Sequence, residues 1–87
     1  MSEDEILKFP CELPIKVFGK NEPGFRQAAV AIVRAHVPTL VDAQISAQES
    51  RGGRFVSLTI RAPLERRAQA DAVYRDLVAC ERVLMVL

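Results

Sequence analysis

Four segments of this chain show the spacing of apolar and polar residues that predicts β-strands. Three of them alternate apolar and polar positions with a period of two, so that one face of each strand packs and the other faces solvent. The fourth is a short run in which almost every residue is apolar. These segments are residues 13–19, 41–48, 54–62 and 82–87.

Two segments between these strands repeat their apolar residues at the spacing of an amphipathic helix. The first is expected over residues 23–37, because the proline at its start suits the first turn of a helix and Pro38 ends it. The second is expected over residues 64–79, directly after Pro63. The apolar stripe of the first helix consists of Phe25, Ala28, Ala29, Ile32 and His36, broadened by Val30, Val33 and Val37, and that of the second consists of Ala70, Val73, Tyr74 and Leu77.

The resulting order of elements, βαββαβ, predicts an α+β domain with the ferredoxin-like fold. In this fold a four-stranded antiparallel sheet carries both helices on one face. Right-handed crossovers place the first and third strands in the centre of the sheet. We expect residues 9–87 to form this single domain and residues 1–8 to form a loosely ordered N-terminal arm.

The other face of the predicted sheet mixes polar and basic residues with a few apolar ones. Phe18, Leu84 and Val86 would form a contiguous apolar patch on it if the first and last strands are neighbours. Exposed apolar patches of this kind often mark interfaces. The patch therefore predicts either a contact between two copies of the chain, which is a homodimer, or a cover formed by the N-terminal arm through Ile6, Leu7 or Phe9.

Composition supports one globular domain and narrows the class of partner. The chain has 87 residues, of which 49% are hydrophobic and 26% are charged, and this balance suits a folded domain with one modest core. Its formal net charge of +1 gives little of the positive potential that nucleic-acid-binding proteins usually display. The sequence shows no signal peptide and no run of about 18 apolar residues. We therefore expect a cytoplasmic protein with no membrane association.

The segment RGGRFVSL, residues 51–58, bears further on the nucleic-acid class. It matches the RNA-reading motif of this kind of sheet at four of its eight positions. However, Gly53 and Leu58 replace two of the three aromatic residues with which that motif stacks bases. We interpret the segment as a glycine hairpin turn followed by a strand, and we expect no nucleic-acid partner.

Reactive side chains are few and scattered. Cys11 and Cys80 lack the spacing of a metal or disulfide motif, and His36 is the only histidine. The remaining acidic groups on or near the second helix have no partner at a recognisable spacing. They are Glu65, Asp71, Asp76 and Glu81. We therefore expect no metal, no cofactor and no enzymatic activity.

Two longer segments, FPCELPIKVFG at residues 9–19 and YRDLVACERVLMVL at residues 74–87, resemble the YbeD-like family of small bacterial proteins of unknown function. The likeness extends over nearly the whole chain in length and order of elements. Members of that family resemble ACT-type regulatory domains, and residues 21–25, NEPGF, are similar to the D-x-P-G-hydrophobic turn that opens the first ACT helix. Asn21 stands where that turn has an acid. The resemblance implies no established activity, cofactor or catalytic residue.

The turn between the first strand and the first helix is the candidate binding site. A helix N-terminus offers unpaired backbone N–H groups and the positive end of the helix dipole. Gly24 lets a ligand or partner approach the backbone closely, and Lys20 or Arg26 is available to pair an acidic group. The candidate residues are Lys20, Asn21, Glu22, Gly24 and Arg26.

We expect a small regulatory or adaptor domain that acts at this turn through an unknown protein partner or small molecule. A second hypothesis is a structural or interaction protein without a small ligand, which associates through exposed strand edges or through the sheet face.

Overall fold

The computed structural model describes residues 8–87 and confirms the predicted order of strands and helices. A short 3-10 helix, η1 (Asp42–Gln44), is the one addition to the predicted set among these residues. The main elements are β1 (Cys11–Lys20), α2 (Pro23–His36), β2 (Ile45–Glu49), β3 (Phe55–Leu64), α3 (Arg67–Ala79) and β4 (Val83–Val86).

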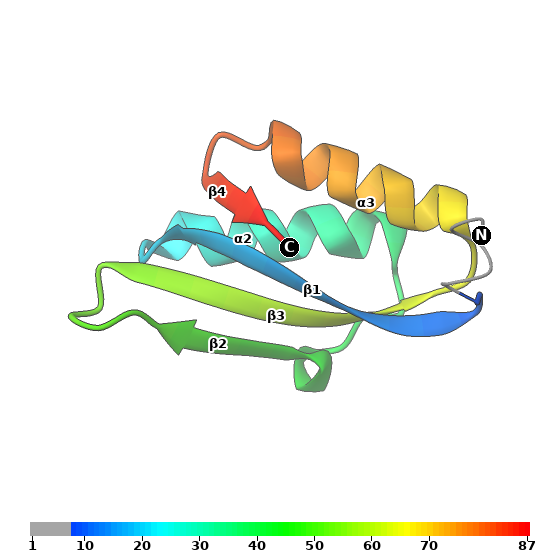
Figure 1. The fold of residues 1–87 in the computed structure, drawn as a ribbon, viewed down its shortest axis with the longest axis horizontal. Coiled ribbons are helices and arrows are strands. Elements are labelled where there is room, and N and C mark those ends of the chain that lie inside the picture. The colour runs from blue at the N-terminus through cyan, green and yellow to red at the C-terminus, as the bar shows by residue number, and fades with distance from the viewer. Residues whose placement is uncertain (1–7) are drawn as a thin grey trace.

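The four strands form one antiparallel sheet in the order β2-β3-β1-β4. The two central strands pair along their whole length, from Cys11 opposite Leu64 to Lys20 opposite Phe55. Both helices lie on the same side of this sheet (Figure 1). The ferredoxin-like fold predicted from the sequence, with the first and third strands in the centre, is therefore confirmed.

The core lies between the sheet and the two helices. Alternate residues of the central strands point toward the helices, and the small side chain of Ala29 lets α2 approach the sheet closely. The side chains that are wholly buried in this layer are Ile15, Val17, Ala29, Val33, Leu58, Ile60, Ala62, Val73 and Leu77. The period-two and helical patterns of the sequence therefore identify the core faces of β1, β3, α2 and α3.

The predicted strand over residues 41–48 is wrong in its first half. Val41 and Gln44 form two hydrogen bonds with each other: the backbone N–H of Gln44 donates to the Val41 carbonyl (3.0 Å), and the Val41 N–H donates to Gln44 Oε1 (2.9 Å). These bonds close one turn of 3-10 helix, so β2 begins only at Ile45. Val41 is 54% exposed, although its place in the alternating pattern predicted a buried side chain.

The third strand does not end at Pro63 but continues through it to Leu64, and α3 begins at Arg67. Leu64 is 1% exposed, since it continues the buried face of β3. Pro63 lies opposite Glu12, beyond the end of β2, so its missing N–H removes no bond from the β2 ladder. The prediction that the second helix starts at residue 64 is therefore wrong.

The last strand pairs with β1 through a bulge that changes the predicted apolar patch. Val17 lies opposite Val86 and Phe18 opposite Met85, but Gly19 lies opposite Val83. Val86 therefore shares the inner face with the buried Val17 and packs against the core. The predicted placement of Val86 beside Phe18 is wrong, because the extra residue of the bulge puts Met85 there instead.

Two other predictions concern the N-terminal arm and the absence of membrane association. The arm predicted for residues 1–8 lies outside the described residues except for Lys8, and it stays a prediction. Within residues 8–87, neither helix has both the length and the apolar character that crossing a membrane requires.

Candidate functional site

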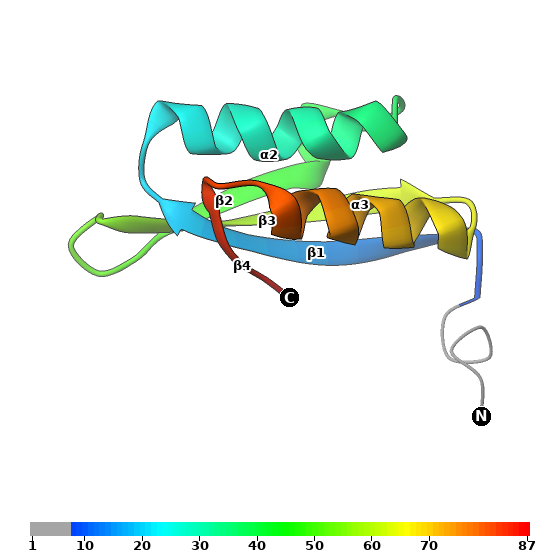
Figure 2. The same cartoon turned by 90° about the horizontal axis from the view of Figure 1, so that it is seen from above.

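The turn that leads from β1 into α2 lies beside the tip of the β2–β3 hairpin, at the same end of the molecule (Figures 1 and 2). Asn21 joins the two segments. Its Nδ2 donates to Glu49 Oε1 (3.0 Å) and to the Gly53 carbonyl (2.9 Å), and its backbone N–H donates to the Arg54 carbonyl (2.9 Å). The turn and the hairpin therefore form one surface.

The hairpin tip has the glycine turn that the sequence predicts. Gly52 and Gly53 have φ values of 89° and 75°, which residues other than glycine rarely adopt. Ser50 closes the loop, because its backbone N–H donates to the Phe55 carbonyl (2.8 Å) and its Oγ accepts from the Phe55 N–H (3.0 Å). This closure fixes Arg54 and Phe55 next to the turn between β1 and α2.

The amide of Asn21 explains why an aspartate would not serve at this position. Both side-chain bonds of Asn21 need a donor, and one of them ends on the carboxylate of Glu49. An aspartate would have no hydrogen to donate and would place a second negative charge beside Glu49. Glu22 occupies the N-cap position of α2 without a side-chain capping bond. At the position where the ACT-type motif has an acid, this chain therefore has an amide that hydrogen-bonds to the hairpin.

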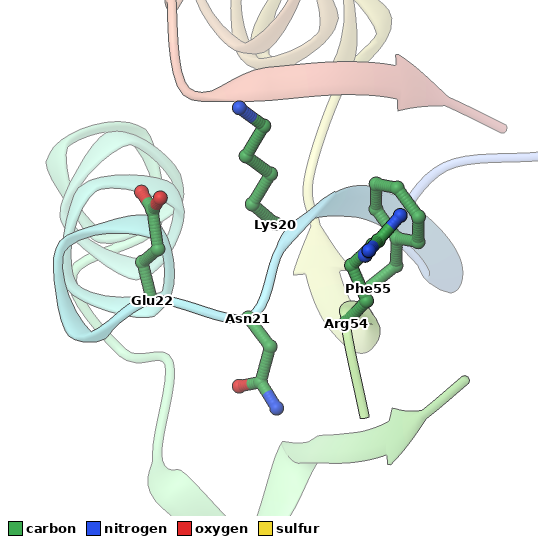
Figure 3. Close-up of a pocket in the computed structure, with 5 residues that line it drawn as sticks. All are labelled: Lys20, Asn21, Glu22, Arg54 and Phe55. Atoms are coloured by element: carbon green, nitrogen blue, oxygen red, sulfur yellow. The ribbon is translucent and has the colours of Figure 1, made fainter. Parts of the chain in front are cut away.

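A hollow of about 420 Å³ lies at the junction of the turn and the hairpin. We call it the turn–hairpin pocket, and Figure 3 shows the residues that line it, which are Lys20, Asn21, Glu22, Arg54 and Phe55. Lys20 lies opposite Phe55 in the sheet register, and Asn21 points away from Lys20 toward the hairpin. The three turn residues of this pocket are among the residues predicted from the sequence. Arg54 and Phe55, which belong to the segment that resembles the RNA-reading motif, complete the same site and were not predicted.

The charges around the pocket are unequal. Glu22 forms an ion pair with Arg82 (Oε2 to Nη1, 3.5 Å), so its negative charge is already balanced. Within residues 8–87, no carboxylate forms an ion pair with Lys20 or Arg54. The pocket therefore presents two positive charges that form no ion pair beside an aromatic ring, while the carboxylate of Glu49 accepts a hydrogen bond from Asn21 at its edge.

Two of the predicted site residues do not line this pocket. A Cβ atom on Gly24 would lie 2.7 Å from the guanidinium of Arg82, so Arg82 already occupies the space above this glycine. Arg26 lines a separate hollow with Val30 and Arg34, on the side of α2 that faces η1 and β2. The structure thus brings Lys20, Asn21 and Glu22 together and leaves the other two apart.

A second polar cluster joins the two helices at the opposite end of α2. His36 Nε2 lies 2.6 Å from Asp76 Oδ2, and Gln69 Nε2 donates to the His36 carbonyl (2.7 Å). No local pattern in the sequence indicates this pair, because 40 residues separate its members. Among residues 8–87, no hydroxyl or thiol hydrogen-bonds to His36, and no three metal-binding side chains gather. The pair therefore fastens α3 to the end of α2.

This contact predicts a pH-dependent stability. Two hydrogen bonds lower the pKa of the Asp76 carboxyl below its ordinary value. The bond from His36 has the larger effect, and the bond from Arg75 comes second. A lowered folded-state pKa stabilises the fold above the ordinary carboxyl pKa, and this contribution is lost as the pH falls through the lowered value. Asp76→Asn should therefore be less stable than the parent at neutral pH, and the difference should shrink in strong acid. Urea unfolding across that pH range measures it.

The matched control for this prediction is His36→Gln, which removes the larger cause of the lowered pKa. It should lose much of the same pH-dependent contribution, and the double variant should lose less than the sum of the two single ones. A stability difference for Asp76→Asn that stays constant from neutral to acid pH would contradict the prediction.

Comparison with known proteins places this chain in a family. A family model described as "Protein of unknown function (DUF493)" matches residues 4–87. A UPF0250 protein of Nitrosomonas europaea is 34% identical over 87 residues, covering 100% of both chains. Relatives of the same description are 35% identical in Chromobacterium violaceum, covering 98% of this chain and 96% of the relative, and 35% identical in Neisseria gonorrhoeae, covering 100% of both. These matches confirm the resemblance to the YbeD-like proteins, whereas the likeness to ACT-type domains stays a prediction. The chain belongs to the DUF493, or UPF0250, family of small bacterial proteins.

Proposed function

We propose that this protein is a small regulatory or adaptor module whose turn–hairpin pocket receives a carboxylate of a partner protein or small molecule. The observation that carries the proposal is the pair of positive charges, Lys20 and Arg54, that no carboxylate of residues 8–87 balances. Both charges line one hollow, together with the ring of Phe55.

The chemistry of the pocket suits a carboxylate that is attached to an apolar group. An arginine guanidinium can hold both oxygens of a carboxylate, and a lysine ammonium adds a third charge-assisted hydrogen bond. Phe55, which is 41% exposed, offers an apolar wall for the remainder of the ligand. Glu22 does not oppose the ligand, because Arg82 already balances its charge.

The pocket is also held in shape before any ligand arrives. The three hydrogen bonds of Asn21 fix the turn against the hairpin, and the bonds of Ser50 fix the hairpin loop. Preorganisation of this kind raises affinity, since less conformational freedom is lost on binding. The backbone that carries the exposed side chains of Lys20 and Arg54 is therefore ordered before a ligand binds.

Backbone NMR shifts during titration with N-acetylglutamate and with succinate test this function. We expect the amides of Lys20, Asn21, Arg54 and Phe55 to shift together. Lys20→Glu and Arg54→Glu should each weaken the interaction by roughly tenfold, because each replaces an attraction with a repulsion.

Arg66→Glu is the matched control, since it makes the same change of charge at the N-cap of α3, outside the pocket. It should leave the titration unchanged. Shifts that spread evenly over the surface, or an equal loss with Arg66→Glu, would show that only net charge attracts these anions.

A further inference from the structure

We propose that the ligand of this pocket is part of a polypeptide, an acidic segment with apolar side chains that lies across the open face of the sheet. This inference rests on the proposed function and names the partner class for the same site. The surface involved lies next to the pocket, and we call it the outer-face patch. It consists of Phe18, Phe55, Met85 and Leu87.

The sheet register brings these side chains together. Phe18 lies directly opposite Met85 of β4, and Leu87, one residue beyond β4, exchanges two backbone hydrogen bonds with Lys16 (3.0 and 2.8 Å), so Met85 and Leu87 share the outer face. Phe18 and Phe55 line a common hollow of about 230 Å³. Both helices cover the opposite face (Figure 1).

Three of the four side chains of the patch are highly exposed, and Phe18 is half-buried. Phe55 is 41%, Met85 50% and Leu87 63% exposed. Apolar residues grouped in this way on one face mark a binding surface more often than isolated ones do. Because Phe55 belongs to both the patch and the turn–hairpin pocket, a single ligand can contact the two together.

The charge of this face indicates which partner fits it. By register, Lys16, Lys20 and Arg61 lie on the outer face and Glu12 is the acid among them, 3.9 Å from Arg61. The sequence has 12 basic residues, all within residues 8–87, and 11 acidic ones, of which three precede residue 8. The described residues therefore carry 12 − 8 = +4, although the whole chain carries +1. A partner with carboxylates is electrostatically complementary to this face.

Two other occupants fit the same observations less well. A second copy bound face to face about a two-fold axis would present the same lysines to each other, and the outer face holds few acids to balance them. A nucleic acid would use aromatic rings for stacking, but two of the four patch side chains are the aliphatic Met85 and Leu87. Apolar side chains of a polypeptide match those two groups.

Selection from a phage-displayed library of random linear peptides, with the full chain as bait, tests the inference. We expect enriched peptides to combine Asp or Glu with Leu, Ile, Met or Phe. The peptide enriched most, made synthetically, is then the probe for titration. Enriched sequences without acids, or no enrichment, would overturn the inference.

Substitutions with matched controls separate the two proposals. Phe55→Ser and Met85→Ser should each weaken binding of the selected peptide by roughly tenfold, whereas Val78→Ser, at a 70% exposed position on α3, should not. Met85→Ser keeps the test decisive if Phe55→Ser disturbs the hairpin. If Lys20→Glu weakens binding of the selected peptide and the patch variants do not, the inference of a polypeptide on the outer face is wrong, and the proposed role of the pocket is unaffected. Losses with the patch variants but not with Lys20→Glu or Arg54→Glu would overturn the pocket.

The alternative occupants are checked in the same preparation. Salt-resistant binding of mixed oligoribonucleotides that Phe55→Ser abolishes would overturn the inference in favour of nucleic acid. A dimer in sedimentation that Met85→Ser disperses would overturn it in favour of a second copy. A full chain that stays monomeric and binds the selected peptide supports the inference.

Discussion

Ala29→Asp is expected to unfold a large part of the protein. Ala29 is wholly buried on the face of α2 that meets the sheet, and no described polar side chain is buried beside it to pair a charge. An unpaired buried charge costs about 3–5 kcal/mol. Domains have total stabilities of roughly 5–15 kcal/mol, and a short chain lies toward the lower end. Urea unfolding followed by circular dichroism measures the loss.

Ala31→Asp is the matched control, because it puts the same side chain on the exposed face of the same helix. It should cost less than about 1 kcal/mol, because alanine and aspartate differ in helix propensity by about 0.7 kcal/mol at most. Equal losses in the two variants would mean that helix propensity, and not burial in the core, limits the stability of α2.

The sequence predicts the core faces well because burial leaves a strong periodic signal. Ile15 and Val17 on β1, and Leu58 and Ile60 on β3, are buried as their spacing of two requires. The central strands are easiest to identify because they pack on one face along their length. The edge strand β2 gives a weaker signal, since only Ile45 of its five residues is buried.

The errors in the fold come from contacts that a local pattern does not contain. Val41 and Gln44 form a 3-10 turn because the Gln44 side chain reaches back to the backbone N–H of Val41. Pro63 is tolerated inside β3 because the neighbouring strand has already ended. Val86 takes the inner face because one bulge shifts the register of β4. Each of these outcomes depends on a partner or on a strand length that alternation alone does not reveal.

For the candidate site, the sequence identified one of two halves. The turn residues were predictable because proline and glycine mark the start of a helix. Their partners were not predictable, since Arg54 and Phe55 belong to a hairpin more than 30 residues away in the sequence. Asn21 Nδ2 joins this hairpin to the turn by its hydrogen bond to the Gly53 carbonyl. Arg82 was missed for the same reason, although it balances Glu22 and covers Gly24. Folding, and not sequence spacing, decides which charges remain unbalanced.

Gly19→Ala is expected to cause the second large effect, through lack of space. The backbone of Gly19 does not adopt a positive φ, so the need for glycine is not conformational. A Cβ atom there would lie 2.4 Å from two ring carbons of Phe25, whose side chain is 1% exposed. The ring cannot move without disturbing the core beneath the first turn of α2. We expect a loss of about 1–3 kcal/mol, as for other overpacked cores, measured by urea unfolding.

The same change should also disturb the turn–hairpin pocket, because Lys20 follows Gly19 directly and Phe25 lies in the first turn of α2, on the other side of the pocket's turn. Amide shifts are therefore expected from Lys20 to Phe25 and at Arg54. Gly24→Ala is the matched control: the atoms nearest to its Cβ would be those of the Arg82 guanidinium, which is the partly exposed end of a flexible side chain and can move aside. Alanine is also favoured over glycine in a helix by about 1 kcal/mol, so this variant should be as stable as the parent or slightly more stable. If Gly19→Ala were as stable as Gly24→Ala, the Phe25 ring would not be fixed in the core, and the turn would lack the rigid support that the pocket requires.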